Sequence, residues 1–202
     1  MKCSKLFFVF LLLIGHALFA QNDSVYLWPA LIPNQTKPKG QPITTTIDDG
    51  STRVTEVTNP FFAVFEPKKE NKNNKAIIVC PGGGYVRLAV HKEGYTVANW
   101  LTGLGYTVFV LQYRVPDNRD GALFDLQRAL KLIRHDSKKY GIDPTKIGAI
   151  GFSAGAHVVA RRAWQIPHTL IQYRMQLIMK MDDLTVWLLF IQAILMRVQI
   201  KL

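Results

Sequence analysis

The sequence predicts an α/β fold in which a mostly parallel sheet lies between two layers of helices. Short apolar segments alternate along the chain with longer segments in which apolar residues recur every three or four positions. The short segments are typical of strands buried on both faces, and the longer ones of amphipathic helices. The order strand, helix, strand, helix, strand favours a parallel sheet with helices on both faces.

The amino-terminal elements depart from this pattern. Residues 21–50 are rich in Pro, Asn, Thr and Gly, which predicts an extended lead-in. Residues 53–57 and 61–65 alternate and carry aromatic or β-branched side chains, and Asn59-Pro60 between them is typical of a turn. We therefore expect residues 53–57 and 61–65 to pair as antiparallel strands.

The central elements are predicted from apolar segments of two lengths. The predicted parallel strands are residues 76–80, 107–111 and 146–150. A helix between the first two strands carries on one face Val97, Ala98, Leu101 and Leu104. The clearest helix covers residues 119–139, and its apolar stripe consists of Ala122, Leu123, Leu126, Ala129, Leu130 and Ile133.

Ser153 lies in a Gly-x-Ser-x-Gly segment, residues 151–155, between a predicted strand and a helix-compatible segment. This context is typical of a nucleophile elbow, a sharp turn with strained backbone angles. Glycines two residues before and after the serine remove side chains that would collide with the crossing strand and helix. The hydroxyl is then exposed at the carboxyl edge of the sheet, and Ser153 is the candidate nucleophile.

Three consecutive glycines, Gly82 to Gly84, follow the predicted strand 76–80. Acyl transfer requires donors directed at the oxygen that becomes negative in the tetrahedral intermediate, and glycines present main-chain N–H groups without side chains in the way. We expect the N–H groups of Gly82 and Gly83, with that of Ala154, to form an oxyanion hole.

A phosphate-binding loop is the alternative interpretation of these glycines. The chain lacks the Lys-Ser or Lys-Thr that follows the glycines of a P-loop. The glycines at positions 148, 151 and 155 do not have the spacing of a dinucleotide-binding motif. Both observations favour the oxyanion hole.

Several motifs occur in a characteristic order along the chain. They are Leu27-Trp28-Pro29, Pro81-Gly-Gly-Gly-Tyr85, Glu93-Gly94, Trp100-Leu101, Gln112-Tyr113-Arg114-x-Pro116, Asp125-Leu-Gln-Arg-Ala129, Tyr140-Gly-Ile-Asp-Pro144 and Gly151-Phe-Ser-Ala-Gly155 with His157. In this order they resemble secreted bacterial esterases of the α/β-hydrolase fold, in the hormone-sensitive-lipase-like and acetylxylan-esterase-like branch. The resemblance covers about residues 25–160. It implies a three-layer α/β-hydrolase sandwich, of which this chain supplies the amino-terminal portion.

The resemblance also implies roles for individual residues. It assigns Ser153 as the nucleophile, places Tyr85 near the acyl or alcohol pocket, and gives the oxyanion donors as Gly82, Gly83 and Ala154. It implies no metal and no organic cofactor. The implied substrate is a small acyl ester or an acetylated polysaccharide such as xylan.

Other residues with reactive side chains receive structural interpretations. His157 lies one helical turn after Ser153, where its ring is expected to point along the helix. Cys80 ends a buried strand without an adjacent base, which is typical of an inert core thiol. Asp125 and Asp136 are interpreted as solvated or capping carboxylates.

Residues 1–20 have the pattern of a secretory signal peptide. Lys2 and Lys5 precede an apolar run over residues 6–14, and small residues follow before Gln21. A membrane anchor is the alternative, but the run is shorter than the roughly 20 apolar residues of a spanning helix. The pattern predicts a secreted or periplasmic protein of a bacterium. After cleavage Cys80 is the one remaining cysteine, which excludes an internal disulfide framework.

Residues 161–202 form an atypical tail that does not follow the family pattern. The tail contains no glycine and no asparagine, although further strand-to-helix turns require them. In α/β hydrolases an acid and then a histidine follow the serine, but here His168 precedes Asp182 and Asp183. The triad acid and histidine are therefore not identified. We hypothesise a shift of reading frame after about Ala160, or a truncation, and expect this chain to be poorly active.

The charge of the chain narrows the classes of function. The sequence has 25 Lys and Arg against 14 Asp and Glu, a formal net charge of +11, but no basic cluster interleaved with aromatic residues in the predicted hydrolase part, residues 21–160. This disfavours nucleic-acid binding.

The first hypothesis is a serine carboxylic ester hydrolase. The alternatives are a non-catalytic carbohydrate-binding or membrane-surface remnant of a hydrolase, and a lipase or peptidase of the same fold.

Overall fold

The computed structural model describes residues 24–164 of the 202-residue chain. The predicted signal peptide, residues 1–20, lies outside the described residues, as does the predicted tail from residue 165 onward. Within residues 24–164 there is no helix of the length and apolar character needed to cross a membrane.

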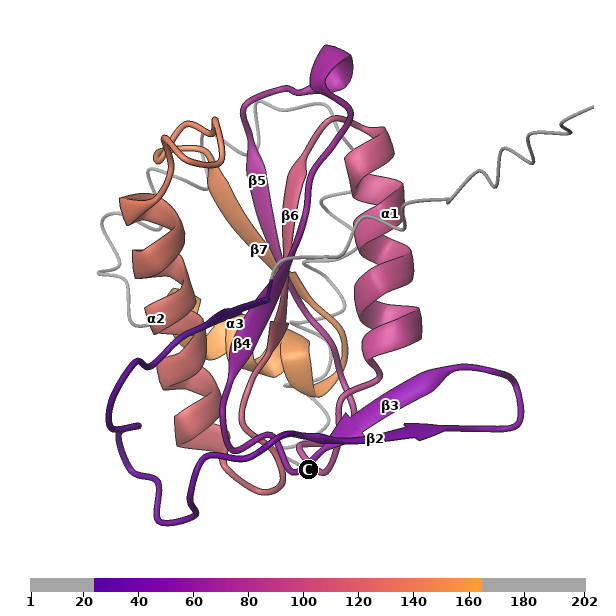
Figure 1. The fold of residues 1–202 in the computed structure, drawn as a ribbon, viewed down its shortest axis with the longest axis vertical. Helices are drawn as coiled ribbons and strands as arrows, with labels where there is room; N and C mark the ends of the chain where they lie inside the picture. The colour runs from indigo at the N-terminus through magenta and orange to yellow at the C-terminus, as the bar shows by residue number, and fades with distance from the viewer. Residues whose placement is uncertain (1–23, 165–202) are drawn as a thin grey trace, which may run out of the picture.

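A five-stranded sheet runs through the centre of the described structure (Figure 1). Its strands, in spatial order, are β1 (Ser24–Tyr26), β4 (Phe61–Phe65), β6 (Thr107–Gln112), β5 (Ala76–Cys80) and β7 (Ile147–Gly151). β4 runs antiparallel to both of its neighbours, whereas β5 pairs in parallel with β6 and β7. The prediction of a mostly parallel sheet is confirmed, with β4 alone running against the other strands.

A separate hairpin, β2 (Ile43–Thr46) with β3 (Thr52–Thr55), projects beside the sheet (Figure 1). The predicted pairing of residues 53–57 with 61–65 is therefore wrong. β4 is buried along most of its length and enters the main sheet, where both of its faces are covered. The exposed, polar β2 pairs with β3 instead. The predicted lead-in, residues 21–50, also contains two short strands.

Helices cover both faces of the sheet, as predicted (Figure 1). On one face, α1 (Thr96–Gly103) follows a π-helical turn, His91–Tyr95, and buries Ala98 and Leu101 against the sheet. On the other face lie α2 (Arg119–His135) and α3 (Ala154–Trp164). Every residue of the predicted stripe on α2 is buried. A short 3₁₀ turn, Lys69–Asn71, precedes β5.

The order of the crossovers places two loops side by side at the carboxyl ends of β5 and β7. The chain leaves β5 through α1 on one face of the sheet, and it leaves β7 through α3 on the other face. Cys80 at the end of β5 is paired with Gly151 at the end of β7. In open α/β sheets the crevice between loops that diverge in this way is where ligands bind.

A buried ion pair connects the lead-in to the sheet and to α2. Asp125 accepts hydrogen bonds from the Arg114 main-chain N at 3.0 Å, from Arg114 Nε at 2.9 Å and from Trp28 Nε1 at 2.9 Å. The other guanidinium nitrogens of Arg114 donate to the carbonyl oxygens of Pro33 and Gly121. Asp125 is fully buried, so its interpretation as a solvated or capping carboxylate is wrong. Burial raises the pKa of Asp125, and the hydrogen bonds from Arg114 oppose this rise.

Candidate active site

Ser153 lies on a sharp turn between β7 and α3. Its φ is +47°, in the left-handed region that residues with side chains rarely adopt, and the residue is exposed. The turn is closed by hydrogen bonds from the Gly155 N to the Phe152 oxygen at 2.8 Å and from the His157 N to the Ser153 oxygen at 3.1 Å. The strained backbone and the exposure that the sequence predicts for Ser153 are therefore both present.

The two flanking glycines are required by close backbone contacts. A Cβ on Gly155 would lie 2.0 Å from the carbonyl oxygen of Cys80, and a Cβ on Gly151 would lie 2.4 Å from the carbonyl carbon of Gly155. Both contacts are far shorter than van der Waals distance. The steric reason that the sequence suggests for these glycines is confirmed.

The triple-glycine loop packs directly against this turn. A Cβ on Gly82 would lie 3.0 Å from the Cβ of Ser153 and 2.6 Å from the carbonyl oxygen of Phe152. The loop follows Cys80, the last residue of β5. The main-chain N–H of Phe152 donates to the carbonyl oxygen of Cys80 at 3.1 Å. The fold therefore brings the predicted nucleophile and the predicted donor loop together.

One predicted oxyanion donor needs correction. The N–H of Gly82 donates a 2.7 Å hydrogen bond to Oε2 of Glu93, so it is already occupied. The amides of Gly83 and Ala154 donate to no acceptor among the described residues. Gly83 has a φ of +138°, which favours glycine. Gly83 and Ala154 stay as the predicted donors.

Tyr85 lies at the end of the same loop and is almost fully buried. Its hydroxyl is 2.9 Å from Nδ1 of His157, and the guanidinium of Arg119 lies 5.2 Å from the centre of its ring. Burial raises the pKa of Tyr85 to about 12, so its hydroxyl stays protonated at neutral pH. His157 therefore contacts the side chain that the resemblance places beside the substrate pocket.

Two residues of the site were not assigned a role from the sequence. Glu93 binds the Gly82 amide, and the Tyr113 hydroxyl donates a 2.6 Å hydrogen bond to the carbonyl oxygen of Pro81. Both belong to motifs of the family resemblance, which was the one available signal. Glu93 is 11 positions from its partner and Tyr113 is 32, so local sequence patterns do not reveal these contacts.

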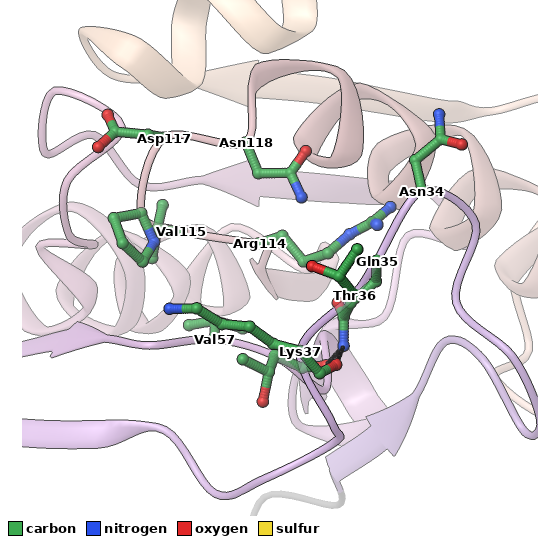
Figure 2. Close-up of a pocket in the computed structure, with 11 residues that line it drawn as sticks. Asn34, Gln35, Thr36, Lys37, Val57, Arg114, Val115, Asp117 and Asn118 are labelled. Atoms are coloured by element: carbon green, nitrogen blue, oxygen red, sulfur yellow. Dashed lines mark hydrogen bonds between the residues drawn. The ribbon is translucent and has the colours of Figure 1, made fainter.

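The described residues also form a pocket of about 180 Å³ (Figure 2). Three separate segments line it, with Asn34, Gln35, Thr36, Lys37, Val57, Thr58, Arg114, Val115, Pro116, Asp117 and Asn118. Ser153 does not line this pocket. The main-chain N–H of Asp117 donates to the main-chain carbonyl oxygen of Tyr85 at 2.8 Å. This hydrogen bond connects the pocket wall to the end of the triple-glycine loop. The lining combines amide and hydroxyl groups with the charged residues Lys37, Arg114 and Asp117 and a few apolar side chains.

In the part of the chain that the structure describes, no group of three or more His, Cys, Asp or Glu side chains is placed to hold a metal ion. Cys80 is fully buried, and burial raises the pKa of its thiol to about 12. This agrees with the interpretation of Cys80 as an inert core thiol. The described histidines include His91 and His135, both of which are exposed.

Comparison with models of protein families shows which family this chain belongs to. The model of the BD-FAE family matches residues 62–181, which is more than half of the chain. The chain belongs to the BD-FAE family. The matched region of this BD-FAE protein includes the triple-glycine loop, Glu93, Tyr113 and the Ser153 turn.

Individual relatives of the BD-FAE chain are known from several organisms. It is 38% identical over 90 residues to an acetylxylan esterase of Xylanibacter ruminicola, covering 44% of this chain and 19% of the relative. It is 40% identical over 88 residues to endo-1,4-beta-xylanase B of Butyrivibrio fibrisolvens, covering 41% of this chain and 14% of the relative. An arylacetamide deacetylase of Oryctolagus cuniculus is 32% identical over 161 residues, covering 74% of this chain and 39% of the relative. The chain therefore spans well under half the length of these relatives.

A solved structure supports the fold assignment of the BD-FAE chain. The acetyl ester-xyloside bifunctional hydrolase of Caldicellulosiruptor lactoaceticus is 34% identical and superposes with a TM-score of 0.54. The match covers 71% of this chain and 47% of the other. The predicted α/β-hydrolase fold is confirmed, with this chain corresponding to part of it.

Proposed function

We propose that the chain carries the nucleophile and oxyanion hole of a serine carboxylic ester hydrolase. The observation that carries the proposal is the exposed Ser153 at φ +47°, which packs against Gly82 of the triple-glycine loop and directly precedes Ala154. The names of the relatives, which include an acetylxylan esterase and a deacetylase, support ester hydrolysis.

In the proposed reaction, Ser153 Oγ attacks the acyl carbon of the ester, and the carbonyl oxygen becomes negative. The N–H groups of Gly83 and Ala154 donate hydrogen bonds to this oxyanion. Ala154 is also the first residue of the 11-residue α3, whose positive dipole end favours negative charge there. The oxyanion then re-forms the carbonyl as the bond to the alcohol oxygen breaks, and the proton lost by Ser153 ends on that oxygen, so that an alcohol leaves. Water next attacks the acyl-serine, which releases the carboxylic acid and regenerates the Ser153 hydroxyl.

A base must accept the proton of Ser153 for this attack to be fast. In this fold the acid and histidine follow the serine on loops after later strands. No residue among those that the structure describes is assigned to either role. We therefore propose that this chain alone hydrolyses esters slowly, since binding and oxyanion stabilisation act without the base.

We propose an acetylated polysaccharide such as xylan as the substrate. The pocket beside Tyr85 supports this choice, because its amide and hydroxyl groups suit the hydroxyl groups of a sugar ring, and Val57 and Pro116 suit its apolar face. Three of the similar proteins have names that refer to xylan or a xyloside, namely the acetylxylan esterase, the endo-1,4-beta-xylanase and the acetyl ester-xyloside hydrolase. Export is part of the proposal and rests on the sequence pattern of residues 1–20.

The experiment compares hydrolysis of p-nitrophenyl acetate and of acetylated xylan by the wild-type chain and by Ser153→Ala. The expected result is slow hydrolysis that Ser153→Ala reduces to the level of buffer, while Ser24→Ala, at an exposed position of β1, retains it. Hydrolysis that survives Ser153→Ala would overturn the nucleophile assignment. Rates like those of a full-length esterase would overturn the proposal that the triad is incomplete.

One observation favours a second function, carbohydrate binding without catalysis. The polar pocket is formed by residues 34–37, 57–58 and 114–118, and none of its walls depends on Ser153. In that case xylo-oligosaccharides would bind, as measured by titration calorimetry, and Ser153→Ala would change neither binding nor hydrolysis.

A further inference from the structure

We propose that Tyr113 and Glu93 are positioning residues that hold the peptide group between Pro81 and Gly82 from both sides, and so direct the next amide, that of Gly83, at the oxyanion. The inference rests on the proposed function of the Ser153 site. In this role Tyr113 and Glu93 act on the reaction through the loop and do not touch the substrate.

The two contacts meet on one rigid unit. The carbonyl oxygen of Pro81 and the N–H of Gly82 belong to the same planar peptide group. The Tyr113 hydroxyl donates to this oxygen at 2.6 Å, and the Gly82 N–H donates to Glu93 Oε2 at 2.7 Å. Because the two bonds are made at opposite edges of this planar group, the group cannot rotate about the chain axis without breaking both.

Main-chain hydrogen bonds hold the rest of the loop, since the carbonyl oxygen of Gly82 accepts from the Ala89 N at 2.9 Å and that of Gly83 from the Val86 N at 3.1 Å. The Pro81–Gly82 peptide group is instead held by the two side chains, Tyr113 and Glu93. Rotation of the Pro81–Gly82 peptide would change the direction of the Gly83 N–H that follows it. An oxyanion donor is effective only when it is oriented before the charge develops.

The surroundings of the two side chains make both hydrogen bonds strong. Tyr113 is fully buried, and burial raises the pKa of its hydroxyl, which therefore stays a donor at all working pH values. The bond from the Gly82 N–H is made to a carboxylate, and such charge-assisted bonds are stronger than neutral ones. A peptide group that accepts at its oxygen and donates at its nitrogen is polarised, and each bond strengthens the other.

The supporting elements are separate from the one that carries the nucleophile. Tyr113 directly follows β6, and Glu93 lies in the π-helical turn before α1. The next residue of that turn, Gly94, is buried, and a Cβ there would lie 2.9 Å from Cγ1 of Val110 in β6. Both residues therefore lie on elements that are fixed to the sheet, and neither belongs to the Ser153 turn.

The first test measures Ser153-dependent hydrolysis of p-nitrophenyl acetate by the full chain, with the rate of Ser153→Ala subtracted. We expect Glu93→Ala and Tyr113→Phe each to lower kcat about 10- to 100-fold with KM unchanged, because loss of one oriented oxyanion donor lowers kcat by roughly 10²–10³-fold. Glu93→Gln retains an acceptor oxygen and is expected to restore most of kcat. The matched control is Glu66→Ala, an exposed carboxylate paired with Lys72.

A double variant distinguishes a shared role of Glu93 and Tyr113 from two independent effects on kcat. Since both side chains hold one peptide group, Glu93→Ala with Tyr113→Phe is expected to lower kcat little more than the worse single variant. Multiplicative losses would overturn the proposal. So would unchanged kcat in both single variants, provided that wild-type hydrolysis depends on Ser153.

The second test does not require catalysis. Exchange of the Gly82 amide hydrogen, followed by NMR on ¹⁵N-labelled protein, is expected to be slow in the wild type and in Glu66→Ala, and at least about 10-fold faster in Glu93→Ala, since the bond to the carboxylate is lost. Fast exchange in the wild type would overturn the proposal. If Ser153→Ala leaves hydrolysis unchanged, the proposed function fails while this exchange still decides whether the peptide group is held. Should Glu93→Ala fail to fold, Tyr113→Phe takes its place in both tests, with lower kcat and faster Gly82 exchange expected, and unchanged values in both would overturn the proposal.

Discussion

At the scale of single residues, Ser153 occupies a backbone conformation that costs about 1–3 kcal/mol for a residue with a side chain. The surrounding packing maintains it, because Gly151 and Gly155 allow strand and helix to approach at backbone distance. These requirements are local, and a five-residue pattern predicts them. The Glu93 contact with the Gly82 amide joins residues from different elements, and no local pattern predicts it.

Replacement of Gly155 tests the close approach at the elbow. We expect Gly155→Ala to lower the free energy of unfolding by about 1–3 kcal/mol, as in overpacked cores, because its Cβ would lie 2.0 Å from a carbonyl oxygen. Gly148→Ala is the matched control in β7, since a Cβ there has no neighbour within 4 Å. Urea unfolding measures both. Equal stability of the two variants would show that the helix is not held this close to β5.

At the scale of elements, the loop between β6 and α2 depends on the buried ion pair. Arg114 is 1% exposed and Asp125 is 0% exposed, and together they connect residues 28–33 of the lead-in to α2. The composition of the lead-in predicts an extended segment, but Trp28 and Pro33 both contact this pair. The same loop lines the pocket beside Tyr85, so the pair also sets the shape of the proposed sugar site.

Removal of one partner tests this connection. We expect Asp125→Ala to lower the free energy of unfolding by about 3–5 kcal/mol, because Arg114 would stay buried without a counter-charge. The control is Asp120→Ala, whose carboxylate is 71% exposed and pairs with Arg161, and for which we expect less than about 1 kcal/mol. Chemical denaturation distinguishes the two. A small effect of Asp125→Ala would mean that Arg114 finds water in its absence.

At the scale of the whole molecule, the site is created by the strand order around β5, since the chain adds β6 on one side of β5 and β7 on the other. α1 leaves the sheet on one face while α2 and α3 lie on the other, so the loops after β5 and β7 meet. Residues 82 and 153 are thereby brought to contact distance. The same layers bury several groups that must stay neutral, among them Cys80, Tyr85 and Tyr113.

Burial of these groups predicts a loss of stability in alkaline solution. The pKa of Cys80 is raised from 9.0 to about 12 and that of Tyr85 from 10.0 to about 12, in both cases chiefly by burial. Because the pKa of each group is higher in the folded than in the unfolded chain, the neutral group contributes fully to the free energy of unfolding below about pH 9. This contribution is lost as the pH rises toward 12, since the unfolded chain ionises first. We expect urea unfolding midpoints to fall between pH 9 and 11.

Two measurements check the origin of this loss. Cys80→Ala is expected to make the decline with pH shallower, because one of the ionising groups is removed. At pH 8 iodoacetamide is expected to leave Cys80 unmodified in the native chain and to modify it after unfolding, as read from the mass of the peptide that contains it. Rapid native labelling of Cys80 would contradict its assignment to the core.

The sequence by itself determined the parts of this protein that depend on short-range patterns. Apolar periodicity predicted β5, β6 and the buried stripe of α2, and glycine spacing predicted the Ser153 turn. Tertiary structure alone decided that β3 pairs with β2 and that β4 enters the main sheet. It also decided that Asp125 is buried against Arg114 and that Glu93 and Tyr113 hold one peptide group. The physical reason is that each of these depends on a partner far along the chain, and the free energy of such a contact exists only once the sheet has brought the two side chains together.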